Sequence, residues 1–126
     1  MKIGFNLLLW TAHVEPAHEP LFVRLRELGY DGVEVPVMRG EVAHYARLGR
    51  AIRDAGLACT CSTAMPGPHA DPIADDAAAR RAGLDHLRWC IDGAAALGAE
   101  VLCGPTYQAL GRFTGSGPTP QEHDRA

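Results

Sequence analysis

One pattern recurs three times along this 126-residue chain: an amphipathic helix rich in alanine, leucine and arginine, then a glycine, then a short apolar run. The copies read FVRLRELGYDGVEVPV, ARLGRAIRDAGLACTCST and CIDGAAALGAEVLCGP, with Gly29, Gly56 and Gly98 after the helical part. Glycine takes a positive φ at little cost, so each of these residues is placed to end a helix. Because the next apolar run follows within a few residues, the pattern predicts alternating helices and strands joined by right-handed crossovers, and hence a parallel sheet.

An opening apolar run, KIGFNLLL, adds one strand before the first copy. The predicted strands are 2–8, 32–37, 57–63 and 100–104, and the predicted helices are 17–28, 41–55 and 74–97. Pro16 and Pro20 suit the opening turn of the first helix, and Asp71 or Asp75 can cap the third.

Four strands and three complete helices amount to the N-terminal half of a (β/α)8 TIM barrel, which typically needs about 250 residues. The alternative is an open, flavodoxin-like sheet, which carries a phosphate loop after its first strand. Here that strand runs into LLWTAHVEPAHEP, which has no glycine, so the α/β half-barrel is favoured. We expect residues 1–126 to form one domain, with 105–126 as a loop and the start of the next helix. In that last segment Thr119 can cap the helix while Glu122 lies three residues on.

The composition is that of an ordinary globular protein, with 47% hydrophobic and 21% charged residues and a net charge of −3. Lysine and arginine are scattered, so no basic stripe is available to bind nucleic acid. No apolar run reaches the roughly 20 residues that cross a bilayer, and we therefore expect no membrane partner. The four cysteines are Cys59, Cys61, Cys90 and Cys103. Their spacing fits neither a zinc site nor a disulfide framework, which predicts buried, reduced thiols and a cytoplasmic protein.

In a parallel barrel the chemistry lies at the carboxyl ends of the strands and in the loops that follow. Glu34 is the sharpest candidate, because a carboxylate inside the apolar strand DGVEVPV is costly to bury without a partner. It belongs either to a site inside the barrel or to an ion pair at the rim. Trp10 offers either an apolar wall for a sugar or a core residue that closes the barrel end.

Ser62 and Thr63 lie later in the chain at the same edge, and each is expected either to hydrogen-bond locally or to contact a ligand. Gly104 either allows a ligand to approach closely or marks a tight strand end. The six histidines form no HExxH or similar metal motif. His44 and His86 are expected on helices far from the site end, whereas His13 follows Trp10 on a predicted site loop. The third helix carries Arg80, Arg81 and Arg88 among several aspartates, which predicts a solvated ion-pair face.

Three segments carry a resemblance to a known family: KIGFNLLLW, LGYDGVEV and DPIADDAAARRAGLDHLRWCIDGAAALGAEVLCGP. They resemble the xylose isomerase-like sugar isomerases and epimerases, and most of all the ketose 3-epimerases of the D-tagatose and D-psicose type. The resemblance implies a (β/α)8 barrel and a divalent metal, Mn²⁺, Co²⁺ or Mg²⁺. It also implies two glutamates that move a proton on the carbon beside the carbonyl through an enediolate.

The positions that this resemblance assigns to substrate binding are Asn6, Trp10, Glu34, Ser62, Gly104 and Tyr107. Asn6 stands where the epimerases often carry an aromatic residue, and Leu110 where some place a tryptophan. The family's metal ligands and both catalytic glutamates lie on strands five to eight. The resemblance therefore implies that residues 1–126 supply part of the substrate pocket, with no catalytic residue and no metal ligand among them.

The function predicted is thus a metal-dependent sugar isomerase or epimerase with a small sugar as substrate, and we expect a homo-oligomer. The alternative is a non-catalytic half-barrel that associates with itself or with a partner to cover its open sheet edges. A DNA repair enzyme of the endonuclease IV type would need basic loops and early histidine ligands, which the sequence lacks.

Overall fold

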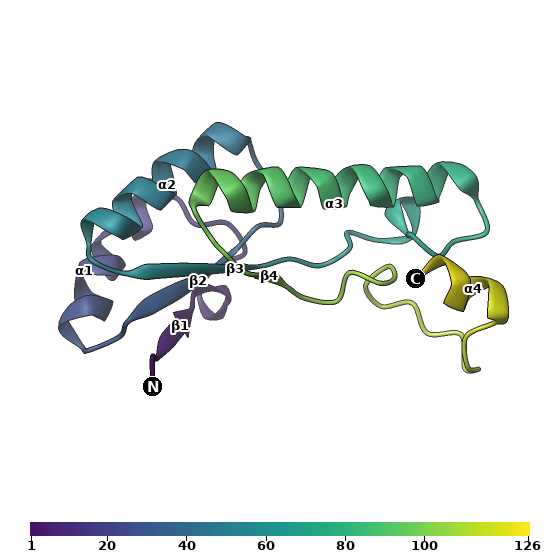
Figure 1. Ribbon diagram of the computed structural model, residues 1–126, viewed down its shortest axis with the longest axis horizontal. Helices are drawn as coiled ribbons and strands as arrows, with labels where there is room; N and C mark the ends of the chain where they lie inside the picture. The colour runs from purple at the N-terminus through teal and green to yellow at the C-terminus, as the bar shows by residue number, and fades with distance from the viewer.

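The computed structural model describes residues 1–126 and contains one parallel sheet of four strands in the order β1-β2-β3-β4 (Figure 1). The strands are β1 Gly4–Asn6, β2 Gly32–Pro36, β3 Ala58–Ser62 and β4 Leu102–Cys103, and the α-helices are α1 Pro20–Glu27, α2 Val42–Asp54, α3 Ala77–Leu97 and α4 Pro120–Arg125. Three short 3-10 turns, η1 Leu7–Leu9, η2 Pro16–His18 and η3 Pro68–Ala70, complete the list. The predicted alternation of helices with parallel strands is confirmed. No helix is long and apolar enough to cross a membrane.

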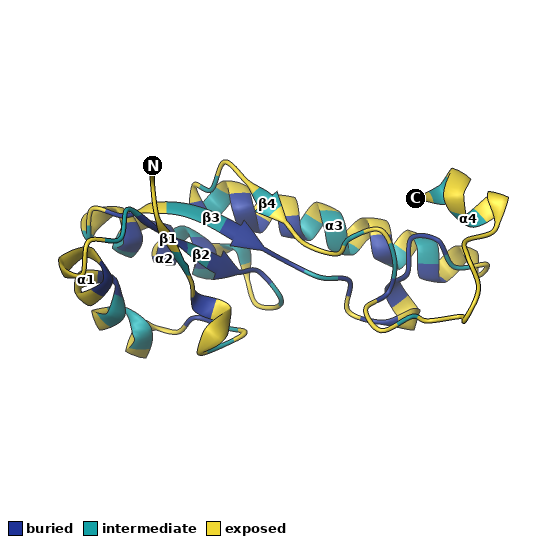
Figure 2. Cartoon of the chain, turned by 90° about the horizontal axis from the view of Figure 1, so that it is seen from below, coloured by how far each residue is buried: buried dark blue, intermediate teal, exposed yellow.

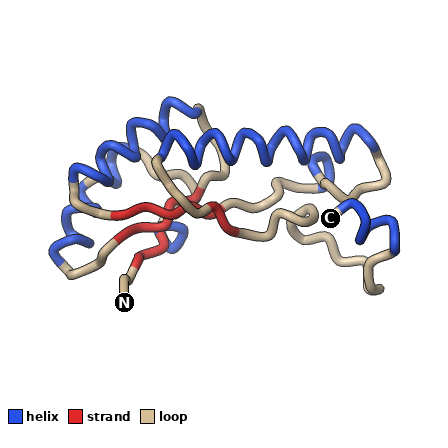
Figure 3. The backbone as a smooth tube through the Cα atoms, in the orientation of Figure 1, coloured by secondary structure: helices blue, strands red, loops and turns tan.

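The hydrophobic core lies between the sheet and the helices α1, α2 and α3, which gather on one of its faces (Figures 1 and 3). Val33, Val35 and Cys61 point to this side from β2 and β3, and they are at most 2% exposed. They pack with α2 residues such as Tyr45 and Ile52. Figure 2 shows the resulting band of buried residues through the two central strands. Because successive strand residues point to opposite faces, the core fixes which residues face the other side.

The second face of the sheet has no covering helix (Figure 3), and its rows follow from the strand register. Asn6 pairs with Glu34, and Glu34 with Thr60, in one row. One row nearer the carboxyl ends, Ser62 pairs with Cys103. In a closed barrel this face would line the interior.

Glycines end three of the helices and allow α2 and α3 to pack closely. Gly29, Gly56 and Gly98 all have positive φ, so their predicted role at helix ends is confirmed. Gly49 has a different role, which the sequence did not reveal: a Cβ there would lie 2.1 Å from the carbonyl oxygen of Leu97. The missing side chain lets α2 approach the end of α3.

Several element boundaries differ from the prediction. Helix α1 begins at Pro20 rather than at residue 17, because residues 16–18 form the turn η2, and β4 covers only Leu102–Cys103 of the predicted 100–104. Two further differences have a side chain as their cause. Strand β1 stops at Asn6 rather than at residue 8, because the Asn6 side chain accepts a hydrogen bond from the Leu8 amide and starts the turn η1. Helix α3 begins at Ala77 rather than at residue 74, and its cap is Asp76, which accepts from the Ala78 amide, instead of Asp71 or Asp75.

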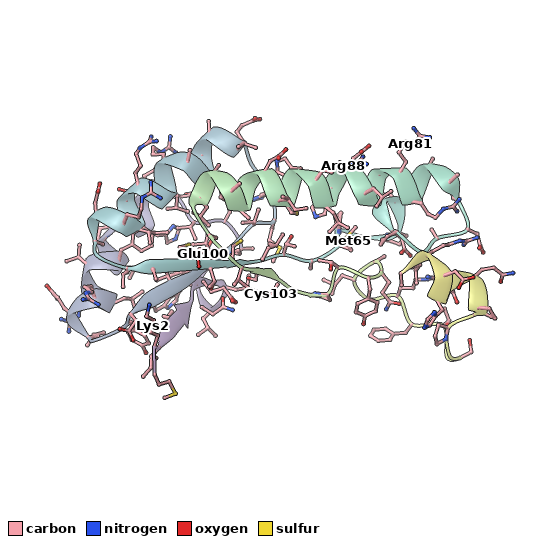
Figure 4. The ribbon with its side chains drawn as sticks, viewed as in Figure 1. Lys2, Met65, Arg81, Arg88, Glu100 and Cys103 are labelled. Atoms are coloured by element: carbon pink, nitrogen blue, oxygen red, sulfur yellow. The ribbon has the colours of Figure 1, made fainter.

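Helix α3 extends past the end of the sheet and covers the segment that follows β4 (Figure 1). Arg81 and Arg88 project from its outer face, away from the sheet (Figure 4). The predicted ion-pair face is confirmed for Arg88, which contacts Asp85 at 2.8 Å. Arg80 instead donates to the carbonyl oxygens of residues 74 and 75, each at 2.8 Å.

Charged side chains tie the last segment to the loop before α3. Arg112 contacts Asp71 at 3.6 Å and also donates to Glu122 of α4. Arg125 contacts Asp75 at 2.9 Å. The predicted capping box at the start of α4 is confirmed, since Thr119 accepts from the Glu122 amide at 3.2 Å.

Candidate functional site

Glu34 lies half-buried on the uncovered face of the sheet, with Asn6 as its nearest polar neighbour. The amide Nδ2 of Asn6 donates to Glu34 Oε1 at 2.6 Å. No lysine, arginine or histidine lies within ion-pair distance of the carboxylate, so the rim ion pair considered as an alternative is absent. Glu34 is therefore a carboxylate oriented by a neutral donor, with capacity to accept further hydrogen bonds.

Cys103 of β4 contacts the second oxygen of the same carboxylate. Its Sγ lies 3.5 Å from Glu34 Oε2, and Cys103 is an exposed residue. Desolvation raises the pKa of the Cys103 thiol, and the charge of Glu34 and their hydrogen bond raise it further. The thiol therefore stays protonated and acts as a weak donor at neutral pH.

Ser62 lies beside Cys103 in the sheet register and is only 9% exposed. Its hydroxyl is buried and has no hydrogen-bond partner. Buried hydroxyls are normally satisfied, so this one stands out as a donor or acceptor that a bound molecule could use. Asn6, Glu34, Cys103 and Ser62 are here called the polar row, a name that covers two successive rows of the same face, Asn6 with Glu34 and Ser62 with Cys103. They come from all four strands, at the carboxyl half of the sheet.

Cys103 is a site residue that the sequence does not predict. The spacing of the cysteines predicts that all four thiols are buried. This is correct for Cys61 and Cys90, but Cys59 is half-buried and Cys103 is exposed. Burial raises the pKa of Cys59 to about 12 and that of Cys61 to about 11, so these thiols are unreactive. Strand alternation from Leu102 was the available signal, since it places residue 103 on the face opposite the core.

Thr63 and Gly104 have structural explanations of their own. Thr63 Oγ1 donates to the Val37 carbonyl at 2.7 Å, which confirms the expected local hydrogen bond. Gly104 has φ +137°, and a Cβ there would lie 1.8 Å from the Thr63 carbonyl oxygen. Of its two predicted roles, the tight strand end accounts for the glycine.

The structure does not bring Trp10 and Tyr107 to the polar row. Trp10 is 53% exposed and stacks on Phe5, with ring centroids 4.5 Å apart. Since Phe5 precedes Asn6 on β1, its side chain points to the opposite face of the strand. Tyr107 lines a separate cavity between the segment after β4 and α4, together with Arg112 and Phe113.

His44 is placed differently from the sequence expectation. It lies in the first turn of α2, which follows the carboxyl end of β2, and it stacks on His13 at a centroid distance of 4.6 Å. The expectation that His44 lies far from the site end is therefore wrong. A helix after a strand begins at the site end, and only its later turns lead away from it.

No group of three or more histidine, cysteine, aspartate or glutamate side chains in residues 1–126 could hold a metal ion. The polar row offers a single carboxylate whose two oxygens already have partners. The donors in this chain therefore do not fit a divalent metal by themselves, and the arrangement can only orient a polar ligand.

Comparison with known proteins shows which family the chain belongs to. The sequence model of the family described as xylose isomerase-like TIM barrel matches residues 22–126. The chain belongs to this family. The match takes in most of α1, all of α2, α3 and α4, and the strands β2, β3 and β4.

A ketose 3-epimerase from Arthrobacter globiformis is 32% identical over 114 residues, which are 90% of this chain and 39% of that protein. Among solved structures, an L-ribulose 3-epimerase has a TM-score of 0.83 at 24% identity, covering 99% of this chain and 42% of its own. A D-allulose 3-epimerase from Methylomonas sp. has a TM-score of 0.82 at 23% identity, covering 99% and 43%. The chain thus spans about two fifths of these relatives, and the predicted half of a TIM barrel is confirmed as its fold.

Proposed function

We propose that this chain forms the N-terminal part of the substrate pocket of a sugar isomerase or epimerase, with a ketose as substrate. One observation carries the proposal. A polar row of one carboxylate, one amide, one thiol and one free hydroxyl lies on the helix-free face of a parallel sheet, at the strand ends where such folds bind ligands. The chain's family and its ketose 3-epimerase relatives support the choice of a sugar.

Each residue of the polar row has its own part in binding a polyol. Glu34 accepts hydrogen bonds from one or two sugar hydroxyls, and Asn6 holds its carboxylate in place. Ser62 supplies a hydroxyl that has no other partner. Such bonds to a charged acceptor are stronger than those between neutral groups and fix the orientation of the ring or open chain. Within this chain the chemistry is therefore binding and orientation, while proton transfer belongs to groups that residues 1–126 do not provide.

The divalent metal implied by the family resemblance also lies outside this set of residues, because no ligand group occurs among them. When bound, such a metal polarises the carbonyl and hydroxyl oxygens of the substrate. We propose no direct bond from Glu34 to it.

The test is ketose binding by the purified protein, measured in the presence of Mn²⁺ or Co²⁺. Glu34→Gln should weaken ketose binding about tenfold, the size expected for one hydrogen bond to a charged group. Glu27→Gln is the matched control: Glu27 is an exposed glutamate of α1 that pairs with Arg24. Equal affinities of the Glu34 variant and the wild type would contradict the pocket assignment.

A second candidate, assembly, is favoured by the free edges of the sheet. Neither β1 nor β4 has a strand on its outer side, and parallel sheets are normally covered on both faces. A cavity of about 260 Å³ lies on the sheet beside Gly4, Gly32 and Ala58, where small residues leave room for a covering layer. We propose that a second layer closes this face, from the rest of a longer chain or from a second copy.

Intact-mass determination together with sedimentation shows whether the covering layer comes from a longer chain or from a second copy. A chain of about 30 kDa, the mass of a complete barrel, would place the covering half in the same polypeptide. A 13.5 kDa chain sedimenting as a dimer would favour two copies that cover each other. A 13.5 kDa chain that stays monomeric at all concentrations would contradict the covering layer.

A further inference from the structure

Three segments of the chain meet at a pair of stacked histidines. His13 comes from the loop Thr11–Glu19 between η1 and α1, and His44 from the first turn of α2. Their ring centroids are 4.6 Å apart with 28° between the planes. Gly40, in the loop between β2 and α2, closes over the His13 ring, since a Cβ at this glycine would lie 3.0 Å from His13 Cε1. The pair therefore joins two loops at the carboxyl edge of the sheet to the start of a helix.

The stack is a side-chain contact between the middle of the loop Thr11–Glu19 and α2. Thr11 and His13 form a local turn, in which the Thr11 hydroxyl accepts from the His13 amide at 3.1 Å and donates to the His13 carbonyl at 2.8 Å. This turn orders the loop but does not reach α2. Val14, which is 1% exposed, anchors the next residue in the core.

The contact between Arg47 and His44 requires a neutral His44 ring. Arg47 lies 3.2 Å from His44 Nδ1, and because a guanidinium can only donate, this nitrogen must accept. His44 Nε2 and His13 Nδ1 are both buried and have no hydrogen-bond partner. A proton added to either ring would place a charge against the other ring and against Arg47.

The electrostatic surroundings of His44 act in the same direction. Burial lowers its pKa, the neighbouring His13 lowers it further, and Arg47 adds a smaller effect. The Val14 carbonyl and the Glu15 carboxylate oppose these effects without cancelling them. Tyr45 packs edge-on against the ring at 5.3 Å, and its hydroxyl donates to the Arg39 carbonyl.

We propose that the His13–His44 stack is a pH-sensitive latch, which holds the loop Thr11–Glu19 against α2 while both rings are neutral and releases it in mild acid. Because the folded state favours neutral His44, the stability that the latch contributes is full above the pKa of a free imidazole, about 6.5, and is lost as the pH falls below it. The loop follows β1, the strand that carries Asn6 of the polar row. The consequence for ligand access therefore rests on the proposed function, whereas the latch itself does not.

The experiment measures hydrogen-exchange protection of the amides in residues 11–19 of the purified protein, from about pH 7.5 to about pH 5, where imidazoles titrate. Protection is expressed relative to the intrinsic exchange rate at each pH. We expect it to fall about tenfold across this range in the wild type. His44→Phe keeps a stacked ring but cannot be protonated, so its protection should not change with pH.

His18 is the control, because it lies in the same loop and is also titratable. Its Nδ1 accepts from the Glu15 amide at 2.9 Å, away from the stack. His18→Gln keeps an acceptor there and should retain the full pH response. The proposal is overturned if His44→Phe loses protection in acid as the wild type does, or if His18→Gln abolishes the response.

A second measurement covers the case in which His44→Phe does not fold. Proton NMR of the wild type gives the titration of both histidine rings directly. The latch predicts that His44 titrates below a free imidazole, and that His13→Phe raises its pKa. Ordinary titration of His44 that is insensitive to His13→Phe would overturn the proposal, and neither readout depends on sugar turnover.

Discussion

The side-chain amide of Asn6 donates a 2.6 Å hydrogen bond to Glu34 Oε1, while its oxygen accepts from the Leu8 amide at 2.8 Å. One side chain therefore ends β1 and orients the carboxylate of the neighbouring strand. Cys103, from the fourth strand, lies 3.5 Å from the other oxygen of Glu34. The carboxylate of Glu34 thus joins Asn6, 28 positions earlier in the sequence, to Cys103, 69 positions later.

The reactivity of Cys103 should report this cluster. Its thiol pKa is raised by desolvation and then by Glu34, so the thiolate is scarce at a given pH and alkylation is slow. Glu34→Gln removes the negative charge, lowers the thiol pKa and should speed alkylation at about pH 8 roughly threefold. Rates are read by peptide mass spectrometry, with Cys103→Ser to identify the labelled site. Equal rates in the wild type and Glu34→Gln would contradict the contact.

Gly104→Ala should be among the most destabilising single substitutions in the chain. The new Cβ would lie 1.8 Å from the Thr63 carbonyl oxygen at φ +137°, so β4 and the end of β3 must separate. We expect a loss of about 4 kcal/mol in the free energy of unfolding, measured by urea denaturation.

Gly111→Ala is the matched control for that substitution. Gly111 also has positive φ, +80°, but no atom lies within 4 Å of its Cβ position. Only the backbone strain remains, which costs about 1 kcal/mol. Similar losses at the two glycines would show that steric contact with Thr63 is not the cause.

Gly49→Ala should destabilise the protein although alanine is the better helix former. The Cβ would meet the Leu97 carbonyl oxygen at 2.1 Å, which forces α2 and α3 apart at a cost of about 3 kcal/mol. Gly93→Ala in α3 meets Val37 Cγ1 at 3.1 Å and Tyr45 Cδ2 at 3.3 Å, so these side chains need to move by only a few tenths of an ångström. There the gain in helix propensity, about 1 kcal/mol, should offset most of the strain. Thermal denaturation of both variants would be compared, and a smaller loss for Gly49→Ala than for Gly93→Ala would contradict the packing.

Arg112→Met should weaken the attachment of the segment after β4. Asp71 is 3% exposed, and without the guanidinium its carboxylate keeps only the hydrogen bond from the Ile73 amide. We expect a loss of about 2 kcal/mol, read by urea denaturation. Arg88→Met removes an exposed ion pair with Asp85 and should change stability by less than about 0.5 kcal/mol. Equal effects would mean that Arg112 contributes no more than a surface pair.

The order of helices and strands could be predicted because it depends on local signals. Gly29, Gly56 and Gly98 mark helix ends through their backbone freedom, and the capping box of Thr119 and Glu122 works within one turn. The predicted boundaries are wrong where one side chain ends a strand or caps a helix. Several nearby residues can make the same capping hydrogen bond, so the sequence does not decide which of them does. Asn6 ended its strand early, and Asp76 rather than Asp71 or Asp75 capped α3.

The candidate site was predicted in part. Glu34 could be predicted as a site residue because a charge in an apolar strand is costly unless it faces a partner or solvent. The sequence does not reveal its partners, because the hydrogen bonds from Asn6 and Cys103 depend on the register of all three strand pairs in the sheet. Trp10 was expected near the same site, but its ring lies on Phe5.

By itself, the sequence determined the α/β alternation, the glycine-ended helices and the half-barrel arrangement, because each follows from periodicity and backbone preference within a few residues. Tertiary structure alone decided which side chains meet: Asn6 with Glu34, His13 with His44, and Gly49 with Leu97. These contacts join segments far apart in the chain. Their geometry is set by strand register and helix packing, which no local pattern encodes.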